Sequence, residues 1–361
     1  MMARRIVVKV GTRLLTSPGG SLDRGRMDGL VRQMAELRAQ GLELVVVSSG
    51  AIVAGMAVLG LARRPTSLPE LQACAAAGQG LLIRLYDELF GARGMKVAQV
   101  LLTQEDVAGR ERYLNIRNTV MTLLAHRLVP IVNENDTVSV DEIKFGDNDR
   151  LSAVVANLVD AQLLVLLSDV PGLLRHGEVI PLVERVTPEL EALARGPQDD
   201  AGLGGMVTKL AAAKAATSAG ITVVIADGRQ AGVLAAILAG QAVGTRFVPR
   251  EAKLTLRKRW LAFVPHRTHG AIIVDEGAKE ALVAKGKSLL PSGVTGCHGA
   301  FKAGELVSIA DEHQREFARG LSNYAAKEIM AIKRAKSSEI ERLLGYQGYD
   351  EVVHRDNLVI L

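Results

Sequence analysis

The sequence predicts an α/β protein, a three-layer sandwich with a mainly parallel central sheet, followed by a small β-rich domain. Two observations support this prediction. Over residues 1–248, short apolar runs without polar alternation recur between segments with helical spacing, which is typical of βαβ units whose sheet is buried on both faces. Beyond residue 248 the apolar runs become shorter and glycines more frequent, which indicates a second module.

The first strand and the first helix show these signals clearly. Residues 4–10, RRIVVKV, are rich in β-branched residues and end at Gly11. Residues 23–40 have apolar side chains at helical spacing, with Asp23 as N-cap and Gly41 after the last turn.

The remaining elements of the first domain follow in the same alternation. Unbroken apolar runs predict strands at 42–48, 95–102, 128–133, 162–168 and 221–226. Alanine-rich or helically spaced segments predict helices at 51–59, 69–92, 113–126, 149–158 and 209–218.

The pattern changes near residue 248. Residues 250–260 are basic and polar and suit a linker or an outer strand. Short strand-like runs follow, AIIVD, SLLP, ELVSIA and EVVHRDNLVIL. We therefore expect a first domain at 1–250, a linker at 251–268 and a small β-rich domain at 269–361.

Composition excludes several classes of protein. A chain of 361 residues with 48% hydrophobic and 23% charged residues is long enough for a large core and too apolar for disorder. Cys74 and Cys297 fit no metal-ligand spacing, so a reducing compartment is expected. No signal-peptide pattern and no apolar run near the ~20 residues of a membrane span are present. We expect a cytoplasmic protein, and a net charge of +5 does not require nucleic acid.

Polar and glycine residues gather where predicted strands end, which is where open α/β sheets bind ligands. Lys9 stands in an apolar strand before Gly11, either as a lysine that snorkels or as a fixed cation beside a close backbone approach. Ser49 and Gly50 precede a helix, where small side chains and amides either cap the helix or bind a carboxylate or phosphate.

The densest polar segment follows the fourth predicted strand. NEND at 133–136 comes directly after it, and Lys144, Asn148 and Asp149 follow. Such a stretch is either a solvated acidic loop or a pocket lining whose Asn and Asp side chains grip an ammonium or amide group. Asp149, three residues before Ser152, is also a candidate N-cap.

A glycine-rich segment, GLGGMVTK at 202–209, leads into the predicted helix that follows it. Its amides are able to approach an anion, and a helix start favours negative charge. A surface turn is the alternative. The segment is no Walker A loop, and no G-x-G-x-x-G follows the first strand, so a dinucleotide fold is disfavoured.

Two lysines, a glycine-rich helix start and an acidic loop together predict phosphoryl transfer, which depends on positioning and charge neutralisation. No Ser-His-Asp set with convincing context and no HExxH motif is present. A carboxylate acceptor needs no general base, because a carboxyl with a pKa of about 4.3 is ionised near neutral pH. Lysines and a metal would offset the repulsion between two anions.

Five segments resemble, in the same order, the amino acid kinase family in its long form with a C-terminal PUA domain. They are VVKVGTRLLT, VVVSSGAIVAG, PIVNENDTVS with KFGDNDRLSA, LLSDVPGL and GGMVTK. The tail segments GAIIVDEGAKEALVAKGKSLLPSGV, GCHGAFKAGELVSI and ARGLSNY are similar to the PUA module. The resemblance implies the amino acid kinase fold and ATP-dependent phosphorylation of L-glutamate to L-glutamyl 5-phosphate, the first step of proline biosynthesis.

The resemblance also implies the catalytic and nucleotide-binding residues. Lys9 and Lys209 neutralise the transferring phosphoryl group, and Asp149 holds both lysines in place. The residues implied to contact the nucleotide are Lys9, Gly11, Gly50, Ser168, Asp169, Leu203, Gly204, Gly205, Met206, Val207, Thr208 and Lys209. Mg²⁺ is expected to ride on ATP, held by phosphate oxygens and water, with no protein ligand.

Glutamate is implied to bind Ser49, Asp136 and Asn148, with Asp136 on the α-ammonium group. Two positions depart from the family pattern: Leu203 replaces the usual Thr and offers only its backbone, whereas Ser168 replaces a common Thr and keeps the hydroxyl.

Two further hypotheses stay open at this point. One is a kinase for another amino-acid carboxylate, and the other is an added RNA-binding role of the PUA module. The small net charge and the 3% of aromatic residues speak against RNA. The expected partners are L-glutamate, proline as a candidate feedback inhibitor, and further copies of the chain in a dimer or tetramer, with no membrane.

Overall fold

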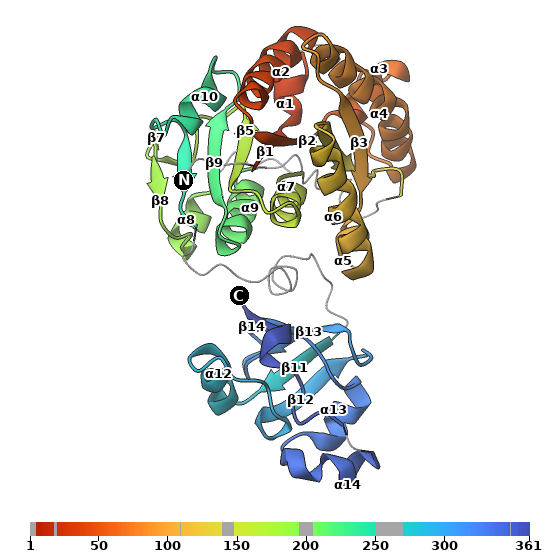
Figure 1. The fold of residues 1–361 in the computed structure, drawn as a ribbon, viewed down its shortest axis with the longest axis vertical. Coiled ribbons are helices and arrows are strands. Elements are labelled where there is room, and N and C mark those ends of the chain that lie inside the picture. The colour runs from red at the N-terminus through yellow and green to blue at the C-terminus, as the bar shows by residue number, and fades with distance from the viewer. Residues whose placement is uncertain are drawn as a thin grey trace. The chain divides into compact units, whose positions relative to one another are not determined.

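The computed structural model describes residues 5–17, 20–108, 110–138, 148–194, 205–249, 270–346 and 348–361. The chain divides into two compact units, Met1–Lys253 and Leu254–Leu361. Each unit has its own sheet (Figure 1). Each also has its own hydrophobic core.

The N-terminal unit is built on a sheet of eight described strands in the order β3-β4-β2-β1-β5-β9-β10-β8. Strand β1 pairs in parallel with β2 and β5, and β4, β3 and β9 extend the sheet in parallel. Strand β10 is antiparallel to β9, so the prediction of a mainly parallel sheet is confirmed. The bounds are β1 (Arg5–Val10), β2 (Glu43–Ser48), β3 (Val97–Leu102), β4 (Val129–Glu134), β5 (Leu163–Ser168), β8 (Leu182–Val183), β9 (Thr222–Asp227) and β10 (Thr245–Phe247).

Helices cover both faces of this sheet and complete three layers (Figure 1). Helices α2 (Arg24–Ala39), α4 (Leu68–Gly91) and α10 (Val233–Leu238) pack on one face, where their apolar side chains join those of β1, β2 and β5 in one cluster. Helices α7 (Asn148–Leu158) and α9 (Met206–Ser218) lie on the other face. The other described helices are α1 (Thr12–Leu15), α3 (Ala51–Val58), α5 (Gln104–Ala108), α6 (Arg110–Ala125) and α8 (Pro188–Leu193).

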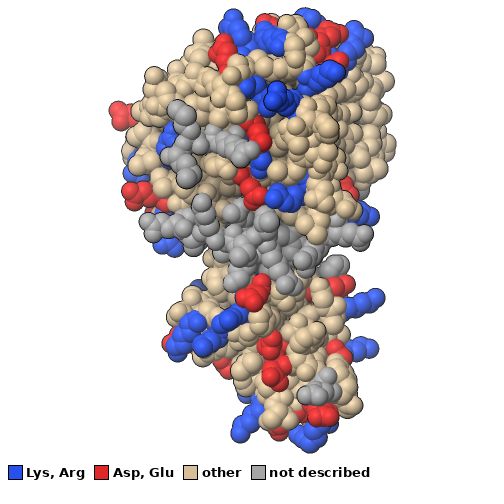
Figure 2. All heavy atoms as spheres, in the orientation of Figure 1, with Lys and Arg blue, Asp and Glu red and all other residues tan. Residues whose placement is uncertain are grey.

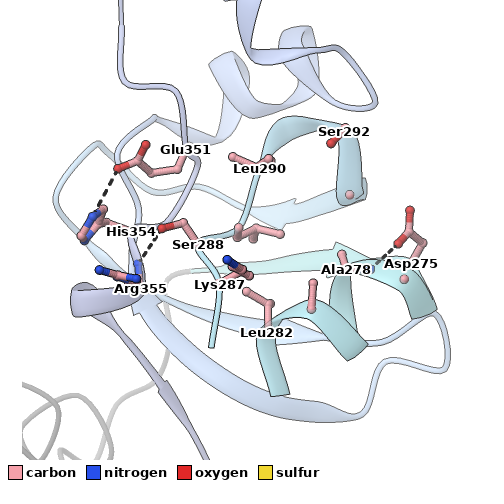
Figure 3. A pocket seen from close by; sticks show the side chains of 14 residues that line it. Asp275, Ala278, Leu282, Lys287, Ser288, Leu290, Ser292, Glu351, His354 and Arg355 are labelled. Carbon is pink, nitrogen blue, oxygen red and sulfur yellow. Dashed lines mark hydrogen bonds and ion pairs between the residues drawn. The ribbon is translucent and has the colours of Figure 1, made fainter. Parts of the chain in front are cut away.

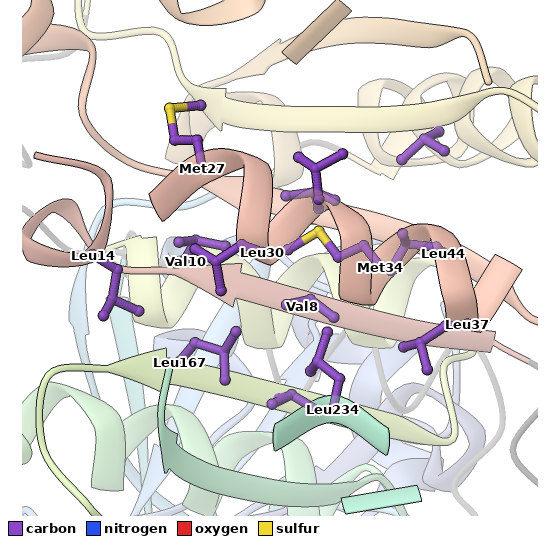
Figure 4. Close-up of a cluster of buried hydrophobic side chains, with 14 of the residues drawn as sticks. Val8, Val10, Leu14, Met27, Leu30, Met34, Leu37, Leu44, Leu167 and Leu234 are labelled. Atoms are coloured by element: carbon purple, nitrogen blue, oxygen red, sulfur yellow. The ribbon is translucent and has the colours of Figure 1, made fainter. Parts of the chain in front are cut away.

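Alternation along β1 decides which layer each of its side chains meets. Val8 and Val10 lie in the hydrophobic cluster with Leu30 and Met34 of α2 (Figure 4). Because neighbouring residues of a strand point to opposite faces, Lys9 points to the layer of α7 and α9. The sheet thus carries a lysine to the helices that hold other candidate site residues.

The predicted strands and helices of this unit lie within three residues of the observed bounds. Asp23 is the N-cap of α2, as predicted, and its side chain accepts a hydrogen bond from the amide of Arg26 at 3.0 Å. Helix α9 begins at Met206 rather than at Lys209, because Gly205 serves as its N-cap. The short elements α1, α5, α8, α10, β8, β10 and the hairpin of β6 (Leu174–Arg175) and β7 (Glu178–Val179) were not predicted, since so few residues show no period.

The C-terminal unit has a five-stranded sheet in the order β12-β11-β13-β14-β15. Two strand predictions were wrong there. SLLP forms no strand, because Pro291 opens a 3-10 turn, and in EVVHRDNLVIL only the last part is a strand. The predicted linker at 251–268 lies outside the described residues. The bounds are β11 (Gly270–Val274), α12 (Glu276–Val283), β12 (Val294–Gly299), β13 (Leu306–Ala310), β14 (Glu316–Leu321), α13 (Ala326–Ile332), α14 (Ile340–Leu344) and β15 (Leu358–Ile360).

Candidate active site

Two lysines share one carboxylate on the α7–α9 side of the sheet. Nζ of Lys9 lies 2.6 Å from Oδ1 of Asp149, and Nζ of Lys209 lies 3.2 Å from Oδ2. The hydroxyl of Thr208 donates to the same Oδ2 at 2.7 Å. We call Lys9, Asp149, Thr208 and Lys209 the lysine cluster. It ties β1, α7 and α9 together.

The charged groups of the lysine cluster are almost completely buried. Lys9 is 5% exposed, Lys209 4% and Asp149 1%. Burial works to raise the pKa of Asp149, but the charges of Lys9 and then Lys209 outweigh it, so that pKa is lowered and the carboxylate is ionised. Burial lowers the pKa of Lys209, and the attraction of Asp149 offsets this only in part.

The balance of charge in the lysine cluster favours an anionic ligand. With both lysines protonated, two ammonium groups face one carboxylate, and the sum is one positive charge. A buried net charge is costly unless a group of opposite charge approaches it. A phosphoryl group or a carboxylate at this place would therefore be stabilised.

A second group of hydrogen bonds begins at the residue before Asp149. Nδ2 of Asn148 donates to Oγ of Ser49 at 2.9 Å, to the carbonyl oxygen of Ser48 at 3.1 Å and to Oδ1 of Asn133 at 3.0 Å. Asn133 in turn donates from Nδ2 to Oε1 of Gln79 at 2.8 Å. We call Ser48, Ser49, Gln79, Asn133 and Asn148 the amide cluster.

The first turn of α7 connects the two clusters, because Asn148 and Asp149 are consecutive residues. Asp149 lies inside α7 and its carboxylate binds the lysines, so the reading of Asp149 as an N-cap does not apply. The register of the sheet supports the same proximity, since Val10 of β1 is paired with Ser48 of β2. Both clusters therefore lie at the carboxyl ends of the central strands, the usual ligand site of an open α/β sheet.

Two predicted glycines lie at these strand ends. The amide of Gly11 donates to the carbonyl oxygen of Leu167 at 3.2 Å, and a Cβ at Gly11 would lie 3.8 Å from Nζ of Lys9. Gly50 is the N-cap of α3 with a φ of 103°, a conformation that residues with a side chain rarely adopt.

Ser168 ends β5, and Asp169 follows it. The hydroxyl of Ser168 donates to Oδ1 of Asp169 at 3.2 Å, and Arg13 pairs with Oδ2 at 3.0 Å. Burial works to raise the pKa of Asp169, but hydrogen bonds, led by the one from Arg13, lower it. Arg229 donates to the carbonyl oxygen of Asp169 at 2.7 Å. Sequence reasoning missed both arginines, because exposed arginines are common and neither belongs to a motif.

The glycine-rich segment is described in part. Leu203 and Gly204 lie outside the described residues. Gly205 is the N-cap of α9, and Met206, Val207, Thr208 and Lys209 form its first turn. The segment therefore offers a helix start from Met206 onward, and its last two residues face the carboxylate of Asp149.

Asp136 lies in the turn after β4 and is half-buried. Burial lowers the pKa of Arg64, and the charge of Asp136 partly offsets this, so the two charges influence one another. Gln79 was not predicted as a site residue. It sits in the alanine-rich helix α4 and belongs to no motif, so that only its contact with Asn133 reveals it.

A separate pocket of about 660 Å³ lies in the C-terminal unit (Figure 3). Leu282 and Leu290 contribute apolar surface, while Lys287, His354 and Arg355 contribute basic groups. Its lining shares no residue with the lysine cluster or the amide cluster.

The described residues contain neither a metal-ligand group nor a helix that could span a membrane. Within the described ranges, no three His, Cys, Asp or Glu residues are grouped so that they could hold a metal ion. Of the helices that the structure describes, none combines the length and apolar character needed to cross a membrane.

Known proteins resemble this chain over its whole length. The model of the amino acid kinase family matches residues 4–227, and the model of the PUA domain matches residues 270–344. Glutamate 5-kinase of Moorella thermoacetica is 52% identical over 366 residues, covering 99% of this chain and 97% of its own length. Glutamate 5-kinase of Pelobacter propionicus is 48% identical over 365 residues, covering 99% and 98%.

A solved structure has the same fold as part of the chain. Carbamate kinase from Giardia aligns with a TM-score of 0.50 at 20% sequence identity, over 68% of this chain and 99% of that one. At this identity the likeness concerns the fold alone.

Proposed function

The chain belongs to the amino acid kinase family, and we propose that it transfers the terminal phosphoryl group of ATP to the side-chain carboxylate of L-glutamate. The product would be L-glutamyl 5-phosphate, in the first step of proline biosynthesis. Relatives named glutamate 5-kinase, 47–52% identical over 99% of the chain, support the choice of substrate.

The lysine cluster is the observation that supports this function most directly. Two buried ammonium groups converge on the carboxylate of Asp149, and the residue before it, Asn148, is hydrogen-bonded to Ser49. A site that must bring two anions together needs fixed positive charge between them and polar groups to hold the acceptor. The two clusters supply both.

The chemistry requires little besides charge and position. An oxygen of the ionised glutamate carboxylate attacks the γ-phosphorus of ATP, and the bond from that phosphorus to the β–γ bridging oxygen breaks. ADP leaves with the electron pair, and no proton has to move. In this proposal Lys9 and Lys209 neutralise charge on the transferring group, while Asp149, itself hydrogen-bonded by Thr208, holds the two lysines in place.

Mg²⁺ would accompany ATP. We expect it to be held mainly by phosphate oxygens and water, as Mg²⁺ usually is at kinase sites. When bound, it would offset charge on the phosphates.

The remaining ligand contacts are also proposals. Ser49, Asn148 and Asp136 would bind glutamate. ATP would contact Gly11, Gly50, Ser168, Asp169 and the segment 203–209, with the helix start of α9 facing its phosphates.

The wider setting belongs to the proposal as well. We assign catalysis to residues 1–250 and regard 251–268 as a linker to a PUA-like domain at 269–361. A homo-oligomer, inhibition by proline and a cytoplasmic location complete it. The sum of one positive charge in the lysine cluster would suit the carboxylate of proline too.

A product assay tests the proposal. The full-length protein is incubated with Mg-ATP and a panel of amino acids, ADP release is followed in a coupled assay, and the acyl phosphate is trapped with hydroxylamine. We expect L-glutamate to give a hydroxamate. The assignment would be wrong if aspartate or N-acetylglutamate supported turnover and glutamate did not, and in that case a kinase for another carboxylate would be favoured.

A further inference from the structure

The amide cluster contains a chain of side-chain amides that runs from α4 to the first turn of α7. Gln79 accepts a hydrogen bond from Asn133, and Asn133 accepts one from Asn148. Asn133 is 2% exposed, so its amide has to find partners within the protein. Of these three hydrogen-bonded side chains, that of Gln79 is the last one counted from the lysine cluster.

Contacts with backbone groups identify which atom is the oxygen and which the nitrogen in the side-chain amides of Asn133 and Asn148. The amide of Glu134 donates to Asn133 at 2.9 Å, so the atom that it meets must be the oxygen Oδ1. The carbonyl oxygen of Ser48 accepts from Asn148 at 3.1 Å, so that atom must be the nitrogen Nδ2. A backbone N–H can only donate and a backbone carbonyl can only accept, which leaves Nδ2 of Asn133 in need of an acceptor. Oε1 of Gln79 provides it.

Close packing of two helices holds Gln79 in place. A Cβ at its neighbour Gly78 would lie 1.9 Å from the carbonyl oxygen of Ala51, and a Cβ at Gly55 would lie 1.7 Å from that of Cys74. Helix α4 therefore rests directly on the backbone of α3, whose N-terminus follows Ser49 and Gly50. The backbone that carries Gln79 has little freedom to shift relative to the serine loop.

We propose that Gln79 is a positioning residue of the substrate site. By accepting a hydrogen bond from Asn133, Gln79 holds the Asn133 side chain, which in turn holds the side-chain amide of Asn148. In this orientation Asn148 offers its amide oxygen to the ligand. Nδ2 of Asn148 lies within hydrogen-bond distance of three protein acceptors, which take up both of its hydrogens, and its amide oxygen is the group left for a substrate. An acceptor calls for a donor, and at neutral pH the donor of glutamate is its α-ammonium group. This inference rests on the proposed function.

The test compares Gln79→Met with Gln79→Glu in the full-length protein. The first keeps the length of the side chain and removes the acceptor, and the second keeps an acceptor oxygen. In Gln79→Met the side-chain nitrogen Nδ2 of Asn133 loses its hydrogen-bond acceptor. We therefore expect the KM for glutamate to rise roughly 10-fold while kcat changes less than about threefold. Gln79→Glu should restore KM to within about threefold of the wild type.

Substrate discrimination gives a readout that a merely structural role would not move. Glutarate has both carboxylates of glutamate and lacks the amino group. The ratio of kcat/KM for glutamate to that for glutarate should fall roughly 10-fold in Gln79→Met and stay near the wild-type value in Gln79→Glu. The exposed Gln241, changed to Met, is the matched control and should alter neither constant.

Each outcome decides between the claims. If the wild type forms no glutamyl hydroxamate, the proposed function fails. The role of Gln79 is refuted if the wild type forms the hydroxamate and folded Gln79→Met keeps the wild-type KM for glutamate and the wild-type preference for glutamate over glutarate. It is also refuted if Gln79→Met and Gln79→Glu raise KM equally. Should Gln79→Met not fold, a crystal structure of the wild type with glutamate decides. Oδ1 of Asn148 on the ammonium group would support the inference, and Nδ2 on a carboxylate would overturn it.

Discussion

Asn148 and Asp149 are neighbours in the chain, yet their side chains bind two different clusters. The amide of Asn148 joins Ser49 after β2, whereas the carboxylate of Asp149 joins the lysines of β1 and α9. One helical turn therefore sets the place of both groups. Any shift of α7 would move the proposed acceptor site and the proposed phosphoryl site together.

Asp149→Asn should destabilise the protein, because it leaves two buried ammonium groups without their carboxylate. We expect the free energy of unfolding at neutral pH to fall by about 3 kcal/mol, and kcat to fall with it. Urea unfolding measures the first and the hydroxamate assay the second. Asp160→Asn is the matched control: Asp160 is part of a partly exposed pair with Arg117 and should cost less than about 1 kcal/mol.

The same variant tests the pH dependence. The pKa of Asp149 is lowered in the folded protein, so its stabilising contribution is present above the unfolded pKa and is lost as pH falls through the folded one. The difference in stability between wild type and Asp149→Asn should therefore be greatest at neutral pH and shrink in acid below about pH 4. A difference that grows in acid would contradict this account.

Lys209→Met should reduce kcat at least 100-fold, while the melting temperature changes little. The lost charge acts mainly on the transition state, and an apolar side chain of similar length still fills the buried site. Lys214→Met on the same helix removes a half-exposed lysine that pairs with Glu191, and should leave kcat within about twofold. A fully active Lys209→Met enzyme would refute the role that we give to Lys209.

As pH rises, kcat should begin to fall at a lower pH than the titration of an exposed lysine would give. Burial lowers the pKa of Lys209, so its ammonium group loses its proton at a lower pH than an exposed lysine does. We expect kcat to decline over that range and Lys209→Arg to move the decline to higher pH, because arginine stays charged there. The measurement is kcat from pH 7 upward, with the stability of the enzyme checked at each pH. An unchanged limb in Lys209→Arg would assign the titration to another group.

Gly78→Ala should be among the more destabilising glycine substitutions in α4. The added Cβ would meet the carbonyl oxygen of Ala51 at 1.9 Å, and backbone yields less readily than a side chain, so we expect a loss of about 3 kcal/mol. Gly80→Ala on the same helix meets no atom within 4 Å and should stabilise the protein by about 0.5–1 kcal/mol. Urea unfolding of the two variants provides the comparison, and similar losses in both would show that steric contact does not matter here.

The pocket of the C-terminal unit should be dispensable for glutamate phosphorylation. Lys287→Glu and Arg355→Glu change exposed side chains of that unit, and we expect kcat and KM to stay within about twofold.

RNA binding by the C-terminal unit is the alternative role. The pocket lining contains no Phe, Tyr or Trp, and basic and acidic groups lie interspersed on the face in Figure 2, so we expect weak, salt-sensitive affinity at most. Tight RNA binding that either variant abolishes would revive that hypothesis.

Sequence reasoning succeeded where a local pattern has a single structural meaning. Apolar runs of six to eight residues predicted the strands of the parallel sheet to within two residues, and the N-cap at Asp23 was predicted because a short acidic side chain satisfies free amides at a helix start. The resemblance of ordered motifs predicted the amino acid kinase family, which the family model and the relatives confirm. The roles of the individual site residues stay predictions.

The sequence by itself determined the order of strands and helices, the family and the residue types that a kinase for a carboxylate requires. Only the tertiary structure showed the contacts by which Lys9, Asp149 and Lys209 meet, which the sequence implied through resemblance alone, and the hydrogen bond that Gln79 accepts from Asn133. Asp149 and Lys209 are 60 residues apart, and Gln79 and Asn133 are 54 apart. Periodicity and capping report on neighbours within a few turns, whereas such contacts depend on which strands lie side by side and on how closely the helices pack across them.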